Sequence, residues 1–351
     1  MSTVTNATKK TLLLQDGFKK IKVFLLIMRY SRQEIFIGSR KQKLLRKATV
    51  TIVGCGGTGS VAAEYLARAG VNLHLIDRDI IEMSDLQRQL YREEDMGKPK
   101  ALALKERLED VNSEIRIAAY PDDLNASNIE HYLSGSSLVL DGSDNMQTRF
   151  LLNDFCMKNK LPFTYAAAIK SEALFTLIMP CETPCLRCFI PNSDETDTCE
   201  TAGVLGPAVG AIGIISAAEA IKYLTTSGLN IKGHILHMNF YKNIYELIEL
   251  KKSKNCPSCR GEYEFLDKPS RRIMQLCGGT YQFLFGKDIN VSDIVNNLGK
   301  NPDFKIINKS RDFVQLSYKK HMISLFKTRM IVQNAKNEKD VRVLTAKIIG
   351  I

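Results

Sequence analysis

The chain has 351 residues, of which 44% are hydrophobic and 25% are charged. This length suffices for two or three domains, and the composition excludes a wholly disordered, a collagen-like and a membrane-embedded protein. The formal net charge is +11, but it is unevenly distributed: residues 1–48 carry +10, residues 270–351 carry +9, and the residues between them carry −8. Two basic flanks around an acidic body argue against one continuous nucleic-acid surface, and we do not expect nucleic acid as a partner.

Residues 1–28 are rich in lysine and weakly patterned, and we interpret them as a basic, disordered extension or as the result of a misassigned start. Their one apolar run, residues 23–28, is too short to cross a membrane and lacks a small-residue cleavage site. We therefore expect a cytoplasmic protein that does not associate with a membrane. We expect residues 29–267 to form one domain and residues 270–351 a second, smaller one.

Residues 49–77 predict a βαβ unit. The β-branched residues 49–53 form a strand that ends in a glycine-rich turn, residues 61–69 carry a helical apolar pattern, and residues 71–76 form a strand that ends at Asp77. In such a unit a phosphate binds at the N-terminus of the helix and a ribose binds the acid. Together, the strand, helix and acid favour nucleotide binding over a structural turn. The glycines of the turn are Gly54, Gly56, Gly57 and Gly59.

The following residues continue the same sheet. The expected strands are 115–119, 138–141, 162–168 and 173–179, the expected helices are 99–111, 127–133, 146–159 and 206–224, and residues 233–250 resemble an antiparallel hairpin. The fold class is therefore a Rossmann-like open α/β sheet of parallel strands with an antiparallel extension and helices on both faces. Asp144 follows the strand at 138–141, where ligands of such sheets collect.

Both NAD and ATP fit a unit of this kind. A dehydrogenase needs an acid or base for hydride transfer, and the five histidines show no such motif. The chain instead offers three cations, Arg32, Arg88 and Lys100, and the acid Asp144. A triphosphate with Mg²⁺ requires such a set, because chemistry at phosphorus depends on positioning and on neutralising negative charge. The chain has no Gly-x-x-x-x-Gly-Lys-Ser/Thr loop, which excludes a P-loop enzyme.

Four of the nine cysteines form two Cys-x-x-Cys pairs, Cys185 with Cys188 and Cys256 with Cys259. Nine cysteines are too few for a disulfide scaffold in a chain of this length. Four thiolates from two distant segments would make a closed tetrahedral Zn²⁺ site, which is structural because no ligand position is open. A redox dithiol and two disulfides are the alternatives.

Six motifs follow one another along the chain. They are Arg29-Tyr-Ser-Arg-Gln33, the glycine loop at 54–59, Leu86-Gln-Arg-Gln89, Gly97-Lys-Pro-Lys100, Ser143-Asp-Asn145, and Cys199-Glu-Thr-Ala-Gly-Val204 with Gly206-Pro207. In this order they resemble the ThiF/MoeB/HesA family, the adenylating enzymes that activate sulfur-carrier proteins and are related to ubiquitin-activating enzymes. The similarity runs from about residue 29 to residue 265.

The resemblance implies that ATP adenylates the C-terminal Gly-Gly carboxylate of a ubiquitin-like or sulfur-carrier protein, with release of pyrophosphate. It implies that Asp77 holds the ribose hydroxyls, with Asp79 near the same site. It further implies that Arg88 and Lys100 hold the phosphates and that Asp144 holds Mg²⁺. The two cysteine pairs occupy the family's zinc positions.

Two more residues take their roles from the resemblance. Arg32 is similar to the arginine that these enzymes insert into the nucleotide site of the neighbouring subunit, which implies a homodimer. Cys199 lies where family members carry a cysteine that takes the acyl group or forms a persulfide-linked adduct. An ordinary loop cysteine is the alternative, because its acidic surroundings disfavour the thiolate. The family usually has Asn where Asp85 stands, and a carboxylate there would repel phosphate unless it binds Mg²⁺ or pairs with Arg88.

Residues 270–351 predict a small α+β domain. The expected helices are 291–298 and 338–349, and the expected strands are 304–307, 313–318, 322–326 and 330–332. Its basic charge would suit an acidic carrier protein, RNA, or simply a solvated surface. Two further functions stay open: a catalytically weak scaffold subunit of a heterodimer, suggested by Asp85, and an ATP-dependent tRNA-modifying relative, suggested by the basic flanks.

Overall fold

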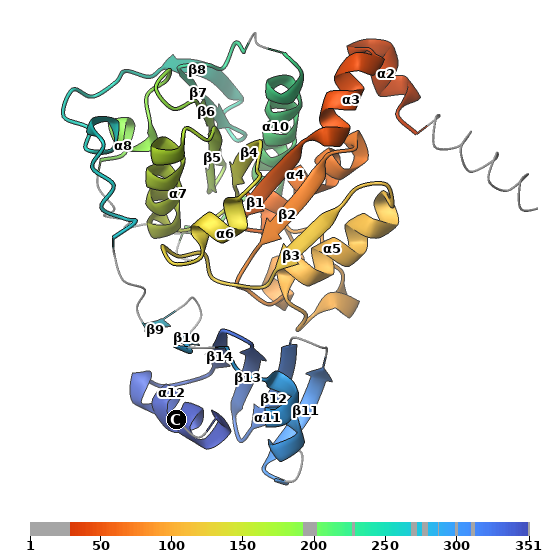
Figure 1. Ribbon diagram of the computed structural model, residues 1–351, viewed down its shortest axis with the longest axis vertical. Coiled ribbons are helices and arrows are strands. Elements are labelled where there is room, and N and C mark those ends of the chain that lie inside the picture. Colours follow the sequence, from red (N-terminus) through yellow and green to blue (C-terminus); the bar gives the residue numbers. More distant parts are fainter. Residues whose placement is uncertain are drawn as a thin grey trace, which may run out of the picture.

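The computed structural model describes residues 29–191, 202–226, 229–267, 272–275, 280–286, 288–298, 301–309 and 313–349. These residues form two β-sheets, each with its own helices (Figure 1). The larger sheet lies within residues 49–249 and the smaller within residues 273–333. The domain boundaries given above stay predictions.

The larger sheet has the strand order β3-β2-β1-β4-β5-β6-β7-β8. Strands β1 to β5 pair in parallel, whereas β6, β7 and β8 are antiparallel to their neighbours. This confirms the predicted open α/β sheet with an antiparallel extension. The strands are β1 (Thr49–Val53), β2 (Asn72–Ile76), β3 (Ile117–Tyr120), β4 (Leu138–Asp141), β5 (Phe163–Ile169), β6 (Glu172–Ile178), β7 (His234–Asn239) and β8 (Ile244–Glu249).

Two hydrophobic cores lie on opposite faces of this sheet. In β1, Val50 and Ile52 belong to one core and Val53 belongs to the other, because successive side chains of a strand point to opposite faces. The first core includes helices α4 (Gly57–Ala69), α5 (Lys100–Val111) and α10 (Gly206–Thr225). The second includes α6 (Ile129–Leu133), α7 (Met146–Asn159) and the short α8 (Leu186–Phe189). Helices therefore cover both faces, as predicted.

Helix α10 packs closely on α4. A Cβ atom on Gly213 would lie 2.7 Å from the carbonyl oxygen of Thr58 and 2.8 Å from Cβ of Val61, so only glycine permits this approach. Within the described residues α10 is the one helix long and apolar enough to cross a membrane, with 44% of the apolar window buried. Its contacts with α4, β5 and β6 are those of a core helix.

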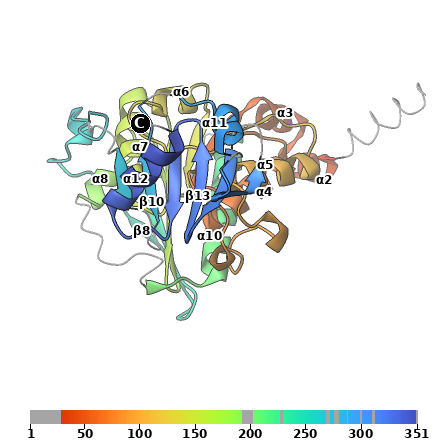
Figure 2. The ribbon, with the colours of Figure 1, turned by 90° about the horizontal axis from the view of Figure 1, so that it is seen from below.

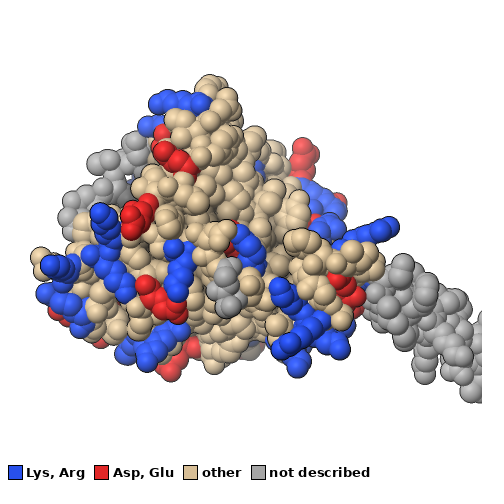
Figure 3. All heavy atoms as spheres, turned by 90° about the horizontal axis from the view of Figure 1, so that it is seen from above, with Lys and Arg blue, Asp and Glu red and all other residues tan. Residues whose placement is uncertain are grey.

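Two helices precede β1 and were not predicted. They are α2 (Ser31–Ile37) and α3 (Ser39–Lys47), and the chain turns between them at Gly38, whose φ of +86° favours glycine. Helix α3 buries only Gln42 and Leu45, which leaves too little apolar periodicity for a prediction. Its exposed basic residues are Arg40, Lys41, Lys43, Arg46 and Lys47. Figure 3 shows Lys and Arg side chains gathered beside the start of the described chain, as expected from this helix.

The smaller sheet is antiparallel, with the strand order β11-β12-β13-β14-β10-β9. Its two helices share a core with Val314, Leu316 and Leu325, and Figure 2 shows them beside the strands. The sequence predicted both helices and four strands but missed the short β9 and β10. The elements are β9 (Ile273–Gln275), β10 (Tyr281–Leu284), α11 (Val291–Leu298), β11 (Phe304–Lys309), β12 (Phe313–Tyr318), β13 (His321–Phe326), β14 (Arg329–Gln333) and α12 (Glu338–Ile349).

Candidate functional site

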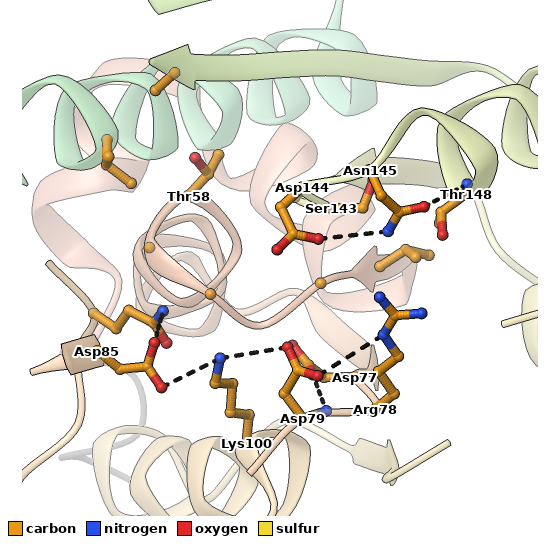
Figure 4. A pocket seen from close by; sticks show the side chains of 18 of the residues that line it. Thr58, Asp77, Arg78, Asp79, Asp85, Lys100, Ser143, Asp144, Asn145 and Thr148 are labelled. Atoms are coloured by element: carbon orange, nitrogen blue, oxygen red, sulfur yellow. Dashed lines mark hydrogen bonds and ion pairs between the residues drawn. The ribbon is translucent and has the colours of Figure 1, made fainter. Parts of the chain in front are cut away.

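A cavity of about 430 Å³ opens at the carboxyl ends of β1, β2 and β4 (Figure 4). Ligands of open α/β sheets bind at this edge, and the volume falls in the range of small-molecule sites. The cavity brings together most of the residues that the sequence singled out. Its lining includes Gly54, Gly56, Gly57, Asp77, Asp79, Arg88, Lys100 and Asp144.

The glycine loop forms one wall of the cavity. Gly54 has φ +90°, and a Cβ atom there would lie 2.5 Å from the carbonyl oxygen of Gly142. Gly59 supports the loop from behind, because a Cβ atom there would lie 1.8 Å from the carbonyl oxygen of Gly54. Helix α4 begins at Gly57, so the N–H groups of its first turn have no partners within the helix. This wall is suited to a phosphate.

Asp77 is buried at the end of β2. Its carboxylate accepts hydrogen bonds from the main-chain N–H groups of Cys55 and Asp79, both at 2.6 Å. Burial and the nearby Asp79 raise the pKa of Asp77 to about 6, against the opposing effect of Lys100. The two main-chain bonds fix the carboxylate beside the glycine loop, in the position expected of a ribose ligand.

Lys100 begins α5 and is 7% exposed. Its ammonium lies 3.6 Å from Asp79 Oδ2 and 3.4 Å from Asp85 Oδ2 (Figure 4). Burial disfavours the charged ammonium, but these carboxylates outweigh burial and raise the pKa of Lys100. In return Lys100 opposes the effect of burial on Asp79, whose pKa is lowered. Lys100 is therefore a fixed positive charge in the cavity.

Asp85, the residue that departs from the family pattern, does not stand unpaired. Its Oδ1 atom accepts a hydrogen bond from Gln89 Nε2 at 2.7 Å and lies 3.4 Å from Arg88 Nη2. Its Oδ2 atom faces Lys100 and also accepts the main-chain N–H of Glu82 at 3.0 Å. Of the two alternatives given for this carboxylate, Mg²⁺ binding or pairing with Arg88, the structure shows the pairing with Arg88, and Lys100 is a second partner. The sequence did not single out Gln89, although it belongs to the same motif.

Asp144 is exposed in the loop between β4 and α7. The neighbouring Asn145 caps α7, since its Oδ1 atom accepts the main-chain N–H of Thr148 at 2.9 Å, and its amide nitrogen lies 3.4 Å from Asp144 Oδ1. Figure 4 shows Asp144 and Lys100 on two sides of the glycine loop. The Ser143-Asp-Asn145 motif thus places an exposed carboxylate at the mouth of the cavity.

The structure does not bring Arg32 to the cavity of its own chain. Arg32 is exposed on α2 and is not among the described residues that line the cavity of its own chain. Its role toward a second subunit stays a prediction. Cys199 lies outside the described residues.

Three lining residues come from the smaller sheet and its flank, namely Thr280, Ile331 and Gln333. No sequence pattern predicts them, because they lie about 200 residues beyond the nucleotide motifs and carry no motif of their own. Arg78, which lines the cavity beside Asp77, is not predicted either. The C-terminal segment therefore takes part in the site.

The two cysteine pairs meet at one place, as predicted, and none of the four cysteines lines the cavity. Their sulfur atoms all lie within 4.8 Å of one another, and the contacting sulfur pairs are separated by 3.4 Å (Cys185 to Cys256) to 3.8 Å (Cys185 to Cys188). Tetrahedral Zn²⁺ with bonds of about 2.3 Å would hold sulfur atoms about 3.8 Å apart. The donors thus fit zinc, and all four are free thiols here rather than disulfides.

Helix α7 clamps the two cysteine segments together. Asn153 Oδ1 accepts the main-chain N–H of Leu186 at 2.9 Å, next to the first pair. Asp154 accepts the hydroxyl of Ser258 at 2.6 Å and the main-chain N–H of Phe265 at 3.1 Å, around the second pair. These buried polar side chains, which the sequence analysis did not single out, fix the geometry of the cluster.

Comparisons with known proteins find relatives for the part of the chain that contains the larger sheet. Residues 30–258 match the ThiF family. The chain is 37% identical over 261 residues to the sulfur carrier protein ThiS adenylyltransferase of Bacillus subtilis, covering 71% of this chain and 77% of that protein. It is 36% identical over 238 residues to the SAMP-activating enzyme E1 of Haloferax volcanii, covering 66% and 88%.

Comparison with solved structures also finds proteins with a similar fold. The crystal structure of E. coli MccB with ATP superposes with a TM-score of 0.59 and 25% identity, covering 66% of this chain and 74% of that chain. The predicted enzyme class, an adenylyltransferase, agrees with the names of the curated relatives. The chain belongs to the ThiF family.

Proposed function

We propose that this chain adenylates the C-terminal carboxylate of a small ubiquitin-like or sulfur-carrier protein that ends in Gly-Gly. The observation that carries the proposal is the cavity, which combines a glycine loop at a helix N-terminus with Asp77, two cations and the exposed Asp144. The relatives named as adenylyltransferases and as an activating enzyme support the same reaction.

In this reaction a carboxylate oxygen of the carrier attacks the α-phosphorus of ATP. The bond between that phosphorus and the oxygen bridging to the β-phosphorus breaks, and pyrophosphate leaves with the bonding electrons. The attacking group is already an anion, so no general base is needed. The site contributes by positioning the two substrates and neutralising charge.

Each residue of the cavity has a proposed task in that scheme. The first turn of α4 binds phosphate oxygens, and Asp77 accepts hydrogen bonds from the ribose hydroxyls. Lys100 and Arg88 neutralise the phosphates, in competition with Asp85. Asp144, an exposed carboxylate on the same cavity, has the hard oxygen donors that Mg²⁺ prefers. Mg²⁺ would supply further positive charge at the phosphates.

We also propose a structural Zn²⁺ ion held by Cys185, Cys188, Cys256 and Cys259, a functional homodimer, and transfer of the activated group to Cys199. The sulfur separations support the zinc ion. The homodimer is supported by α2, where Ile35 and Phe36 next to Arg32 are 78% and 90% exposed. A second copy would cover these apolar side chains and bring Arg32 to a neighbouring site.

ATP–pyrophosphate exchange in the presence of a carrier that ends in Gly-Gly tests the main proposal. The wild-type chain should catalyse exchange, and Asp144→Ala should lose it by about 100-fold or more, because Mg²⁺ would lose the carboxylate that holds it beside the phosphates. Asp110→Ala is the matched control, since Asp110 is an exposed acid on α5 outside the cavity lining.

The outcomes separate the proposed enzyme from a scaffold subunit. Full exchange in Asp144→Ala would overturn the role of this cavity. Absence of exchange in the wild-type chain with saturating carrier would favour the scaffold. Cys199→Ser should keep exchange but block transfer, so loss of exchange in that variant would contradict the cysteine assignment.

A further inference from the structure

The smaller sheet packs one of its faces against the part of the chain that contains the larger sheet, here called the larger unit. This contact lies next to the cavity. Phe313, Phe326 and Ile331 point from this face and form a small hydrophobic core with Ile80, which follows β2. The opposite face carries α11 and α12. Both faces of the smaller sheet are therefore buried, so this sheet is packed against the larger unit rather than loosely tethered to it.

A fully buried guanidinium lies at the centre of this interface. Arg329, at the start of β14, has an exposed fraction of 0%. Its Nη2 atom donates to the main-chain carbonyls of Arg78 and Pro121, and its Nη1 atom donates to Gln282 Oε1 at 3.0 Å. The guanidinium also stacks over the ring of Phe326, 4.2 Å from the ring centre. The two carbonyls directly follow Asp77 and directly precede Asp122, so one side chain ties the ends of β2 and β3 together.

Two acids of the larger unit complete the network. Asp123 accepts from Gln282 Nε2 at 2.8 Å and from Arg78 Nη1 at 3.2 Å. Asp122 accepts from the Thr328 hydroxyl at 2.9 Å and lies 3.8 Å from Arg329 Nε. Two guanidinium groups thus balance two carboxylates that would otherwise repel an anionic ligand.

The network ends on the wall of the cavity. Arg78, Asp122 and Asp123 line it, and so do Ile331 and Gln333 of β14. Gln333 Nε2 also donates to Glu82 Oε1 at 2.7 Å, and Glu82 is another lining residue. The contacts of the smaller sheet therefore converge on the part of the cavity beside the ribose acid.

We propose that the C-terminal unit completes the nucleotide site and that Arg329 is a positioning residue for ATP. Arg329 holds the main chain directly after Asp77 and directly before Asp122, and so fixes the ribose and base end of the cavity. The inference rests on the proposed use of this cavity for ATP. It assigns to the C-terminal unit a part in binding one substrate, and it requires no residue of that unit to touch the reacting atoms.

Steady-state ATP–pyrophosphate exchange on the full chain tests the proposal. Arg329→Gln should raise the KM for ATP about tenfold or more and leave kcat within about twofold, because an interaction made equally in the ground and transition states changes KM alone. Thr328→Val removes one hydroxyl and keeps the shape, and it should raise KM about threefold. Arg329→Lys keeps the charge but loses the forked donors, so it should fall between the wild type and Arg329→Gln.

Arg342→Gln on α12 is the matched control, because Arg342 is exposed. This substitution should leave the KM for ATP unchanged. A purely structural role of Arg329 would lower the active fraction, and hence the apparent kcat, without changing KM. Unchanged KM in both Arg329→Gln and Thr328→Val would overturn the inference. If the wild-type chain shows neither exchange nor calorimetric binding of ATP with Mg²⁺, the proposed function fails instead.

Discussion

Lys100 and Asp85 form a buried ion pair inside the cavity, with Nζ and Oδ2 3.4 Å apart and side chains 8% and 7% exposed. Asp85 thus pairs with the cation that we assign to the phosphates. A bound triphosphate would have to share Lys100 with this carboxylate. We therefore expect the acid at position 85 to lower nucleotide affinity rather than to abolish the site.

Asp85→Asn should lower the KM for ATP by about fivefold, because it removes a negative charge next to the phosphates. The substitution also removes the ion pair with Lys100, which should lower the free energy of unfolding by about 1 kcal/mol. The asparagine can still accept the N–H of Glu82 through Oδ1, so the local turn should persist. The measurement is the KM for ATP in pyrophosphate exchange.

Asp95→Asn is the control for this substitution. Asp95 closes a similar 3₁₀ turn, accepts the main-chain N–H of Arg92 at 3.2 Å and pairs with Lys98 at 2.9 Å, but it does not line the cavity. Its KM for ATP should equal that of the wild type. A KM in Asp85→Asn that is unchanged or higher would show that the carboxylate takes part in binding, for example through Mg²⁺.

Asp77 should make ATP binding depend on pH. Its pKa is raised to about 6 while Lys100 stays charged and the Cys55 thiol stays neutral, because burial raises the pKa of Cys55 well above its usual value. Below about pH 6 the protonated carboxyl is a poorer acceptor for ribose hydroxyls, so the KM for ATP should rise as pH falls, by up to about tenfold per unit.

The stability of the free protein should change in the opposite direction. The folded-state pKa of Asp77 exceeds its ordinary value of 3.8. The stabilisation that this carboxyl group gives to the folded state is therefore fully present below pH 3.8 and is lost as the pH rises toward 6. In Asp77→Asn the KM for ATP and the free energy of unfolding should both depend less on pH. A KM for ATP that does not change between pH 7 and pH 5 would contradict the assignment of Asp77 to the ribose.

The sequence predicted the parts of the site that lie close together along the chain. Strand, glycine loop, helix and Asp77 fall within 30 residues, and their order alone implies their geometry. Arg329 meets Arg78 across 251 residues, and Ser258 meets Asp154 across 104. Such contacts depend on how whole units pack and leave no periodic trace in the sequence. The sequence pattern does not predict helices α2 and α3 either, because they bury few apolar residues.

The contact between α4 and α10 should tolerate no side chain at Gly213. Gly213→Ala would place a Cβ atom 2.7 Å from a main-chain oxygen, so it should destabilise the fold by about 1–3 kcal/mol. Gly210→Ala is the matched control on the same helix, because a Cβ atom there meets nothing within 4 Å. It should stabilise the fold by about 0.5–1 kcal/mol through helix propensity. Urea unfolding measures both, and equal effects would contradict the proposed close packing.

The purified chain should contain one Zn²⁺ ion per subunit, and Cys188→Ser should lose it. The ion joins segments that are about 70 residues apart, so a strong chelator should lower the Tm of the wild type. Cys181→Ser is the control, because Cys181 is an exposed free thiol in the same region. Native mass spectrometry counts the metal. Retention of zinc in Cys188→Ser, or its loss in Cys181→Ser, would show that the four cysteines are not the ligands.

Complementation tests whether Arg32 acts in a neighbouring subunit. Arg32→Ala and Asp144→Ala should each be inactive as homodimers, because each site then lacks one group. When the two are mixed and allowed to exchange subunits, a heterodimer regains one complete site, so activity should return to about one quarter of the wild-type level. The control mixes the wild type with the double variant, whose heterodimers contain no complete site. No recovery in the first mixture, with exchange verified by copurification of differently tagged subunits, would mean that Arg32 does not act across a dimer interface.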